Sequence, residues 1–450
     1  MSATPSSAGS DRLAAALALA RETKALLIEP GALRHCAALF ADQFPGKKAL
    51  VVADTTTFAV AGITVQDALT AAGLTNADPV ILPAQGLYAE YRWVETLQEN
   101  FGRHDAVPVA VGSGTINDLV KLAAHLVGRP YLCVATAASM DGYTAYGASI
   151  TRDGSKQTFA CPAPQAVLAD MEILAAAPSA MTASGYADLQ AKLTAGADWI
   201  LADALGVEPI DAVVWDIVQA DLRAALVAPA QARTGDPAAI AALTAGLMLG
   251  GFAMQRHQTS RPASGAEHQF SHLWDMEHLT GDDGAPSHGF KVGVATLAVA
   301  ALYEALLRRP LEQLDVAACG AAWPDWSVAR DQIRTMFADA DFITTPLREA
   351  QLKHPSREEL QTQLQQLKTR WPQLRDRLRA HLPPATELRR NLELVGAPVT
   401  PEAIGLTRTR LRNSFLRACH IRRRFTVLDL AVRTGLLDEC LAEIFPATQA

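Results

Sequence analysis

The stretch VPVAVGSGTINDLVKLAAHLVG, residues 107–128, contains the pattern that decides the fold. Residues 107–111 form a short apolar run that predicts a buried strand. Gly112 and Gly114 follow directly, and apolar residues then recur at helical spacing until Gly128, a typical helix C-terminus. A strand, a glycine turn and a helix in this order predict one repeat of a parallel sheet flanked by helices.

The same alternation extends on both sides of this stretch. Further strands are predicted by KKALVVAD (47–54), PVIL (79–82), PYLCVAT (130–136) and AVLAD (166–170), and ASITRDGSKQTF (148–159) indicates a hairpin with Asp153 and Gly154 at its tip. From Pro178 onward, long Ala- and Leu-rich amphipathic segments predict helices only. We therefore expect three regions: a tail and the start of a first helix (1–19), an α/β Rossmann-like dinucleotide-binding domain (20–177), and an all-α metal- and substrate-binding domain (178–450).

The composition is that of an ordinary globular protein. The 450 residues are 49% hydrophobic and 19% charged, and the net charge of -7 gives no reason to expect binding to nucleic acid or to a membrane. Six cysteines without a CxxC pair favour a reducing, cytoplasmic setting. No uninterrupted apolar run reaches the roughly 20 residues that a bilayer span needs.

The glycine turn is a candidate phosphate site. Gly112 and Gly114 allow a sharp turn and close approach of a ligand, and the following helix N-terminus offers free N–H groups with partial positive charge. Asn117 stands where the GxGxxG fingerprint has its third glycine, so a plain tight turn remains an alternative.

Two further places at the same predicted sheet edge favour nucleotide binding. Asp54 ends an upstream strand, where carboxylates contact ribose hydroxyls and repel a 2′-phosphate, which favours NAD; a helix-cap or turn role is its alternative. Thr136, Ser139 and Asp141 lie in a polar loop after the next strand. Loops at this edge bind ligands in open α/β sheets.

Five of the eleven histidines lie within 32 residues: His257, His268, His272, His278 and His288. On a helix, His268, His272 and Asp275 share one face, and imidazoles with a carboxylate are typical of an open divalent-metal site. The spacing does not decide between His268 with His272 and His268 with His288, and a face of surface histidines is the alternative to both.

Asp188 is a candidate acid for the same site. It lies in TASGYADLQAKLTAGADW (182–199), whose apolar positions suit a core. A buried carboxylate there requires a partner, a capping role or a metal ion, and an ion pair with Lys192 is the simplest alternative.

Five motifs together carry a resemblance: VGSGTINDLVK (111–121), TAASMDGYTA (136–145), GYADLQAK (185–192), SGAEHQFSHLWDMEH (264–278) and SHGFKVGVATL (287–297). Across most of residues 20–440 the chain resembles the glycerol-1-phosphate dehydrogenase family, especially its bacterial AraM-like branch. That family belongs with iron-containing alcohol dehydrogenases and dehydroquinate synthase, so the resemblance implies a dehydroquinate synthase-like fold. It also implies reduction of dihydroxyacetone phosphate to sn-glycerol 1-phosphate with NADH or NADPH and one divalent metal ion, Zn, Ni or Fe.

The resemblance implies roles for individual residues. It makes Asp188, His268 and His288 the metal ligands, and it places Asp141, His272 and Asp188 at the substrate. It thereby selects His288 over His272 as the second imidazole ligand. The residues implied to contact the dinucleotide are Asp54, Gly112, Ser113, Gly114, Thr115, Ile116, Asn117, Asp118, Thr136, Ala137, Ala138 and Ser139.

Two positions depart from the family pattern. Ser113 replaces the middle glycine of the turn, which is tolerable only if this residue avoids positive φ. Ala145 lacks the hydroxyl that relatives direct at the cofactor, which predicts weaker or altered nicotinamide binding. Lys192 and Lys291 are the nearby candidates for holding the substrate phosphate.

The expected chemistry is hydride transfer at substrate C2, with a Lewis-acid metal on the C2 oxygen and His272 or a water chain moving the proton. The expected partners are a phosphorylated triose or polyol and a second copy of the chain in a homodimer. The alternatives are a polyol (glycerol-type) dehydrogenase or a dehydroquinate synthase-like carbocycle-forming enzyme on the same scaffold, and a non-catalytic nucleotide- or metal-binding protein.

Overall fold

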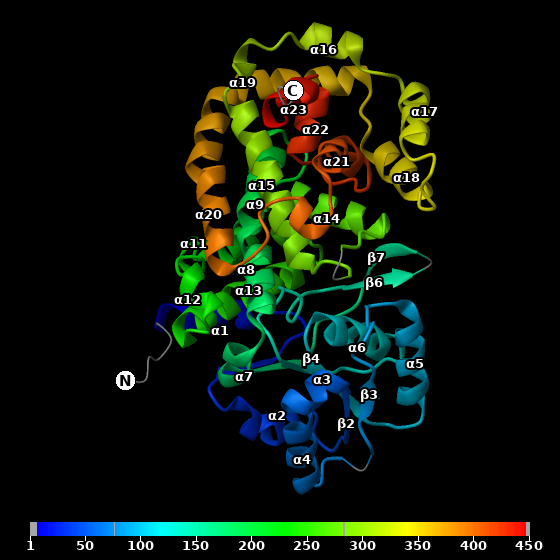
Figure 1. The fold of residues 1–450 in the computed structure, drawn as a ribbon, viewed down its shortest axis with the longest axis vertical. Coiled ribbons are helices and arrows are strands. Elements are labelled where there is room, and N and C mark those ends of the chain that lie inside the picture. The colour runs from blue at the N-terminus through cyan, green and yellow to red at the C-terminus, as the bar shows by residue number, and fades with distance from the viewer. Residues whose placement is uncertain (1–6, 76, 153, 282–283, 447–450) are drawn as a thin grey trace. The chain divides into compact units, whose positions relative to one another are not determined.

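The fold is described from a computed structural model for residues 7–75, 77–152, 154–281 and 284–446 (Figure 1). The strands are β1 (Ala25–Glu29), β2 (Ala49–Asp54), β3 (Val80–Leu82), β4 (Val107–Gly112), β5 (Leu132–Ala135), β6 (Ala148–Arg152), β7 (Ser155–Phe159) and β8 (Ala166–Asp170). The helices up to residue 176 are α1 (Ser7–Ala18), α2 (Cys36–Gln43), α3 (Thr55–Thr57), α4 (Ile63–Ala71), α5 (Tyr91–Gly102), α6 (Gly114–Leu126) and α7 (Met171–Ala176).

After residue 176 the described chain is helical. The helices that follow are α8 (Ser179–Gln190), α9 (Lys192–Ala204), α10 (Ala212–Gln219), α11 (Leu222–Ala225), α12 (Pro229–Arg233), α13 (Pro237–His257), α14 (Ala266–Met276), α15 (His288–Leu307), α16 (Val316–Ala322), α17 (Trp326–Met336), α18 (Thr344–Lys353), α19 (Arg357–His381), α20 (Ala385–Val395), α21 (Arg408–His420), α22 (Val427–Arg433) and α23 (Leu437–Ile444). The predicted combination of an α/β region with an all-helical region is confirmed.

Six strands form one parallel sheet in the order β1-β8-β5-β4-β2-β3. Alternate residues of β2 point to opposite faces: Leu50 and Val52 pack into the core that includes α5 and α6, whereas Val51 and Ala53 pack into the core that includes α2 and α4. Helices therefore cover both faces, which explains why these strands read as continuous apolar runs. Figure 1 shows α5 and α6 beside β3 and β4.

The strand order reverses at one point of this sheet. After β2 the chain adds β3 on one side and then β4 on the other side of β2. The register pairs Ala53 with Val111, so Asp54 and Gly112 end neighbouring strands. Ligands bind at such a reversal of strand order, outside the carboxyl ends of the strands.

One strand of the sheet was not predicted. β1, with the sequence ALLIE, lies at the sheet edge and pairs in parallel with β8. The predicted hairpin is present as the antiparallel pair β6 and β7, and Gly154 has φ of 72°. Asp153, the other residue of the predicted tip, lies outside the described residues.

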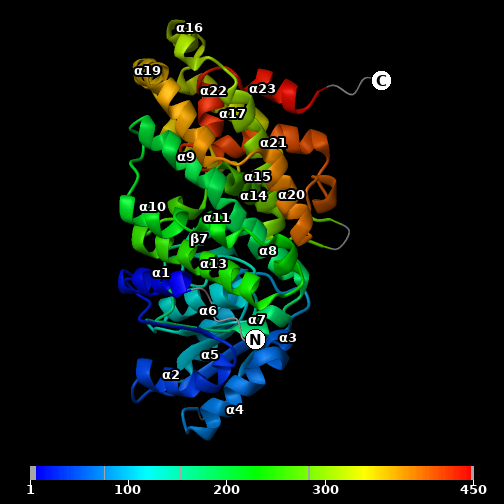
Figure 2. The same ribbon diagram turned by 90° about the vertical axis from the view of Figure 1, so that its left-hand side faces the viewer.

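The chain forms two compact units. The first consists of Met1–Leu189, Val213–Pro262 and Leu394–Gly396, and the second of Gln190–Ala212, Ala263–Glu393 and Ala397–Ala450. The helical region after residue 178 thus contributes to both units. Within the second unit, α14 packs against α15 and α21 (Figure 2).

Among the described residues, two helices are long and apolar enough to cross a membrane by length and composition alone, α13 and α15. The apolar window of α13 is 67% buried inside the protein and that of α15 is 83% buried. Core helices of globular proteins meet the same criteria, and we assign both helices to the cores of their units.

Candidate metal centre and dinucleotide site

The turn between β4 and α6 is closely packed at its two glycines, most tightly at Gly112. A Cβ at Gly112 would lie 2.6 Å from the Cβ of Ile116, and one at Gly114 would lie 3.1 Å from Cγ of Met140. Ser113 precedes the helix with φ of -95° and ψ of -159°, an extended conformation that any residue adopts. The condition for tolerating a serine there is met. The turn places the N-terminus of the 13-residue helix α6 at the point of the sheet where the strand order reverses.

Asp54 caps the short helix that follows β2. Its Oδ1 accepts hydrogen bonds from the N–H groups of Thr56 (2.8 Å) and Thr57 (2.9 Å), and the Thr57 hydroxyl accepts from the Asp54 N–H. This is the capping role that the sequence left open. Contact of Asp54 with a ribose stays a prediction.

The other implied dinucleotide residues fall into two groups. Ser113, Gly114, Thr115, Asp118 and Ser139 are partly exposed, whereas Gly112, Ile116, Asn117, Thr136, Ala137 and Ala138 are buried. The Asn117 side chain is engaged inside the protein, because it donates to the carbonyl of Gly142 (3.2 Å) and accepts from the Tyr131 hydroxyl (3.0 Å). The Asn117 side chain therefore holds the loop that follows β5 through the carbonyl of Gly142.

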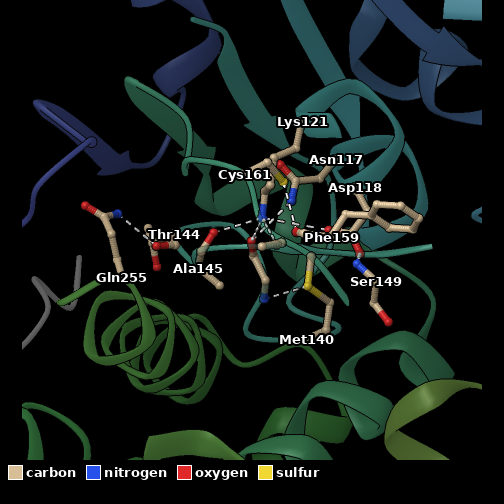
Figure 3. Close-up of polar contacts among 12 residues, drawn as sticks. Asn117, Asp118, Lys121, Met140, Thr144, Ala145, Ser149, Phe159, Cys161 and Gln255 are labelled. Carbon is tan, nitrogen blue, oxygen red and sulfur yellow. Dashed lines mark hydrogen bonds and ion pairs between the residues drawn. The ribbon is translucent and has the colours of Figure 1, made fainter. Parts of the chain in front are cut away.

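Lys121 organises that loop, residues 136–147 (Figure 3). Its fully buried ammonium group donates to the backbone carbonyls of Gly142 (2.9 Å), Ala145 (3.0 Å) and Gly147 (3.1 Å). Burial raises the pKa of Asp118, and the ammonium group 3.8 Å away opposes this shift. The loop is thus held from α6 through charge-assisted hydrogen bonds, which are stronger than neutral ones.

Helix α8 approaches the same loop closely. A Cβ at Gly185 would lie only 1.9 Å from the carbonyl oxygen of Ala138. One turn later, the fully buried carboxylate of Asp188 accepts a hydrogen bond of 3.1 Å from the Asp141 N–H. The loop therefore touches α8 at the residue that the sequence singled out as a metal ligand.

Asp188, His268 and His288 can each offer one ligand atom such that these atoms all lie within 4.8 Å of one another. They come from three helices, α8, α14 and the first residue of α15. A carboxylate and two imidazoles at this spacing form a donor set that would fit one divalent ion. Asp188 and His268 are buried, and His288 is the most exposed of the three.

The neighbouring residues on α14 and α15 also have defined positions. The ring centroids of His272 and His288 are 6.5 Å apart, and those of His268 and His288 are 5.3 Å apart. The ammonium group of Lys291, a candidate for the substrate phosphate, forms an ion pair with Asp275. Nothing in the geometry tests the substrate roles of His272 and Asp141, which stay predictions.

Glu267, which was not among the residues expected at the site, lies against His268. This carboxylate is fully buried, and its Oε1 lies 2.8 Å from Nδ1 of His268. Burial raises the pKa of Glu267. The hydrogen bond and charge of His268, together with the hydrogen bonds from Gly265 and Thr194, lower it by more, so the net shift of the pKa is downward. Its only signal in the sequence was an acid in the first turn of a helix beside a candidate ligand.

Known proteins show similarity at both the sequence and the fold level. The model of the iron-containing alcohol dehydrogenase family matches residues 27–178. The glycerol-1-phosphate dehydrogenase (NAD(P)+) of Halalkalibacterium halodurans is 37% identical over 265 residues, or 58% of this chain and 66% of that relative. The protein of the same name from Geobacillus thermodenitrificans is 30% identical over 399 residues, or 88% of this chain and 87% of that relative.

Among solved structures, the glycerol dehydrogenase of Schizosaccharomyces pombe superposes with a TM-score of 0.57 at 16% identity, covering 94% of this chain and 90% of that one. At this identity the likeness shows the fold alone, and it confirms the predicted dehydroquinate synthase-like architecture. The sequence match to the Geobacillus relative runs through both the α/β and the helical regions. With that length and identity, the chain belongs to the glycerol-1-phosphate dehydrogenase family of NAD(P)-linked oxidoreductases.

Proposed function

We propose that this protein is a metal-dependent enzyme that reduces dihydroxyacetone phosphate to sn-glycerol 1-phosphate with NADH or NADPH. The observation that carries the proposal is the convergence of Asp188, His268 and His288, whose ligand atoms lie within 4.8 Å of one another. Their donor set fits a divalent ion such as Zn, Ni or Fe. The relatives are named for glycerol 1-phosphate and NAD(P)+, and dihydroxyacetone phosphate is the ketone that corresponds to this alcohol.

The proposed ligand residues are supported by their neighbours. Asp188 is fully buried, and an isolated buried carboxylate is costly, so partners such as a metal ion and the Asp141 N–H stabilise its charged form. The N-terminus of α6 would hold the dinucleotide pyrophosphate through its N–H groups. When bound, a divalent ion supplies Lewis acidity toward the substrate carbonyl and the nicotinamide supplies the hydride. His272 is the candidate for moving the proton.

A steady-state assay tests the proposal. We expect the metal-loaded protein to oxidise NADH with dihydroxyacetone phosphate, to lose this activity in a chelator and to regain it with Zn or Ni. Chiral analysis of the product should give the sn-1 enantiomer. Equal turnover of unphosphorylated dihydroxyacetone would favour a polyol dehydrogenase, and absence of any net NADH oxidation would favour a dehydroquinate synthase-like enzyme or a binding protein. A cytoplasmic homodimer stays part of this proposal.

Replacement of Asp54 tests the proposed cofactor contact. In Asp54→Asn the amide oxygen can still accept the cap hydrogen bonds from Thr56 and Thr57, so we expect less than about 0.5 kcal/mol change in unfolding free energy. The lost charge removes the repulsion toward a 2′-phosphate. The KM ratio of NADPH to NADH should therefore fall by about tenfold, equivalent to about 1.4 kcal/mol. An unchanged ratio in a stably folded variant would restrict Asp54 to capping α3.

A further inference from the structure

The contact of Glu267 with His268 indicates which ring nitrogen of the imidazole carries the proton. Oε1 of Glu267 lies 2.8 Å from Nδ1 of His268, and both side chains are buried. An ionised carboxylate only accepts hydrogen bonds, so Nδ1 must carry the proton that is shared in this contact. The other ring nitrogen, Nε2, is then left with its lone pair.

Glu267 is itself held in place from two further sides. Its Oε1 accepts from the N–H of Gly265 (2.6 Å), and its Oε2 accepts from the Thr194 hydroxyl (2.8 Å) on α9. A Cβ at Gly265 would lie 2.5 Å from Oδ2 of Asp198, 2.8 Å from the Cα of Ala195 and 2.9 Å from Oε2 of Glu267, so this crowded helix start requires glycine. The carboxylate thus has a fixed orientation before any ligand arrives.

We propose that Glu267 is a positioning residue that holds His268 in the tautomer with Nε2 available to a divalent metal ion. The inference rests on the proposed metal site and deepens it. A hydrogen bond from the second nitrogen of a ligand imidazole fixes the ring and raises its basicity, and removal of such a partner typically costs about 10- to 100-fold in metal affinity.

A second buried carboxylate provides a matched control. Asp198 accepts hydrogen bonds from the N–H groups of Ala266 (2.7 Å) and Val427 (2.8 Å) and from the Tyr303 hydroxyl (2.6 Å). It therefore anchors the first residue of α14, whereas Glu267 binds the N–H of the preceding residue, Gly265, and none of these three Asp198 contacts is with an imidazole. A change at Asp198 removes the same charge near the same helix start and leaves the imidazole contact in place.

The experiment measures Zn²⁺ affinity of the metal-stripped full-length protein by competition with a chromophoric chelator. We expect Glu267→Gln to weaken Zn²⁺ binding about 10-fold and Glu267→Ala about 100-fold. Asp198→Asn should lower the thermal midpoint but change Zn²⁺ affinity less than about 3-fold, because no imidazole contact is lost. Tyr303→Phe, which removes one hydrogen bond to Asp198, gives a milder control should Asp198→Asn fail to fold.

A spectroscopic readout separates orientation from stability. The visible absorption of the Co²⁺-loaded protein should change in Glu267→Gln and stay unchanged in the Asp198 or Tyr303 variant. Equal Zn²⁺ affinity and an unchanged Co²⁺ spectrum in Glu267→Gln would overturn the inference. Failure of the wild-type protein to bind either metal would instead overturn the proposed function, so the two failures are distinguishable.

Discussion

Asp188→Asn should lower kcat/KM for dihydroxyacetone phosphate by about 1,000-fold or more and abolish tight metal binding. The change keeps the size of the side chain, and the amide oxygen can still accept the hydrogen bond from the Asp141 N–H. It removes the only anionic member of the proposed ligand set, Asp188, His268 and His288. Metal content by mass spectrometry and steady-state kinetics on the same preparation measure both effects.

Asp170→Asn is the matched control for this prediction. Asp170 is also a buried aspartate, and it accepts from the N–H groups of Gly31, Leu33 and Glu172 at the end of β8. The variant should lose about 1–3 kcal/mol of stability and keep its metal content. Wild-type metal content and activity in Asp188→Asn would remove Asp188 from the metal site.

Gly185→Ala should reduce the unfolding free energy by about 3 kcal/mol and weaken NADH binding at least tenfold. The added Cβ would lie 1.9 Å from the Ala138 carbonyl oxygen and 3.0 Å from the Ser139 Cα. Both neighbours are backbone atoms, so the loop must move away from α8. That displacement would carry the Thr136–Ser139 segment, proposed to contact the dinucleotide, out of position.

Gly102→Ala controls for the general effect of replacing a helical glycine. Gly102 is the last residue of α5, and a Cβ there would meet nothing within 4 Å. The alanine reduces the freedom of the unfolded chain and should stabilise the protein by about 0.4–1 kcal/mol. Denaturant unfolding and NADH titration of both variants give the comparison. Similar stability of Gly185→Ala and Gly102→Ala would show that the loop can move away from α8 at little cost in free energy.

The sequence predicted most of the sheet because its buried strands are continuous apolar runs bounded by glycine turns and amphipathic helices. β1 was missed, since its five residues make sense as a strand only through pairing with β8, and Ala25 and Ala166 are 141 positions apart. Such non-local pairing leaves no periodic trace. The register that sets Asp54 beside the glycine turn likewise appears only in the folded sheet.

Only part of the candidate site could be predicted from the sequence, for a similar reason. The clustering of histidines was visible in the sequence, but the choice of His288 over His272 came from the resemblance, because sequence geometry alone could not rank the two pairs. Glu267 was missed since its partner Thr194 lies 73 positions away on another helix. Asp54 shows the limit in the other direction: its residue type fits both a ribose contact and a helix cap, and the cap is the contact present in the structure.

Anomalous X-ray scattering from crystals of the Zn- or Ni-loaded protein tests the metal site most directly. We expect one strong anomalous peak within about 2.0–2.2 Å of a carboxylate oxygen of Asp188 and of one nitrogen each of His268 and His288, with Nε2 as the nitrogen of His268. A fully loaded protein whose peak lies on other residues, or away from any of these three, would contradict it.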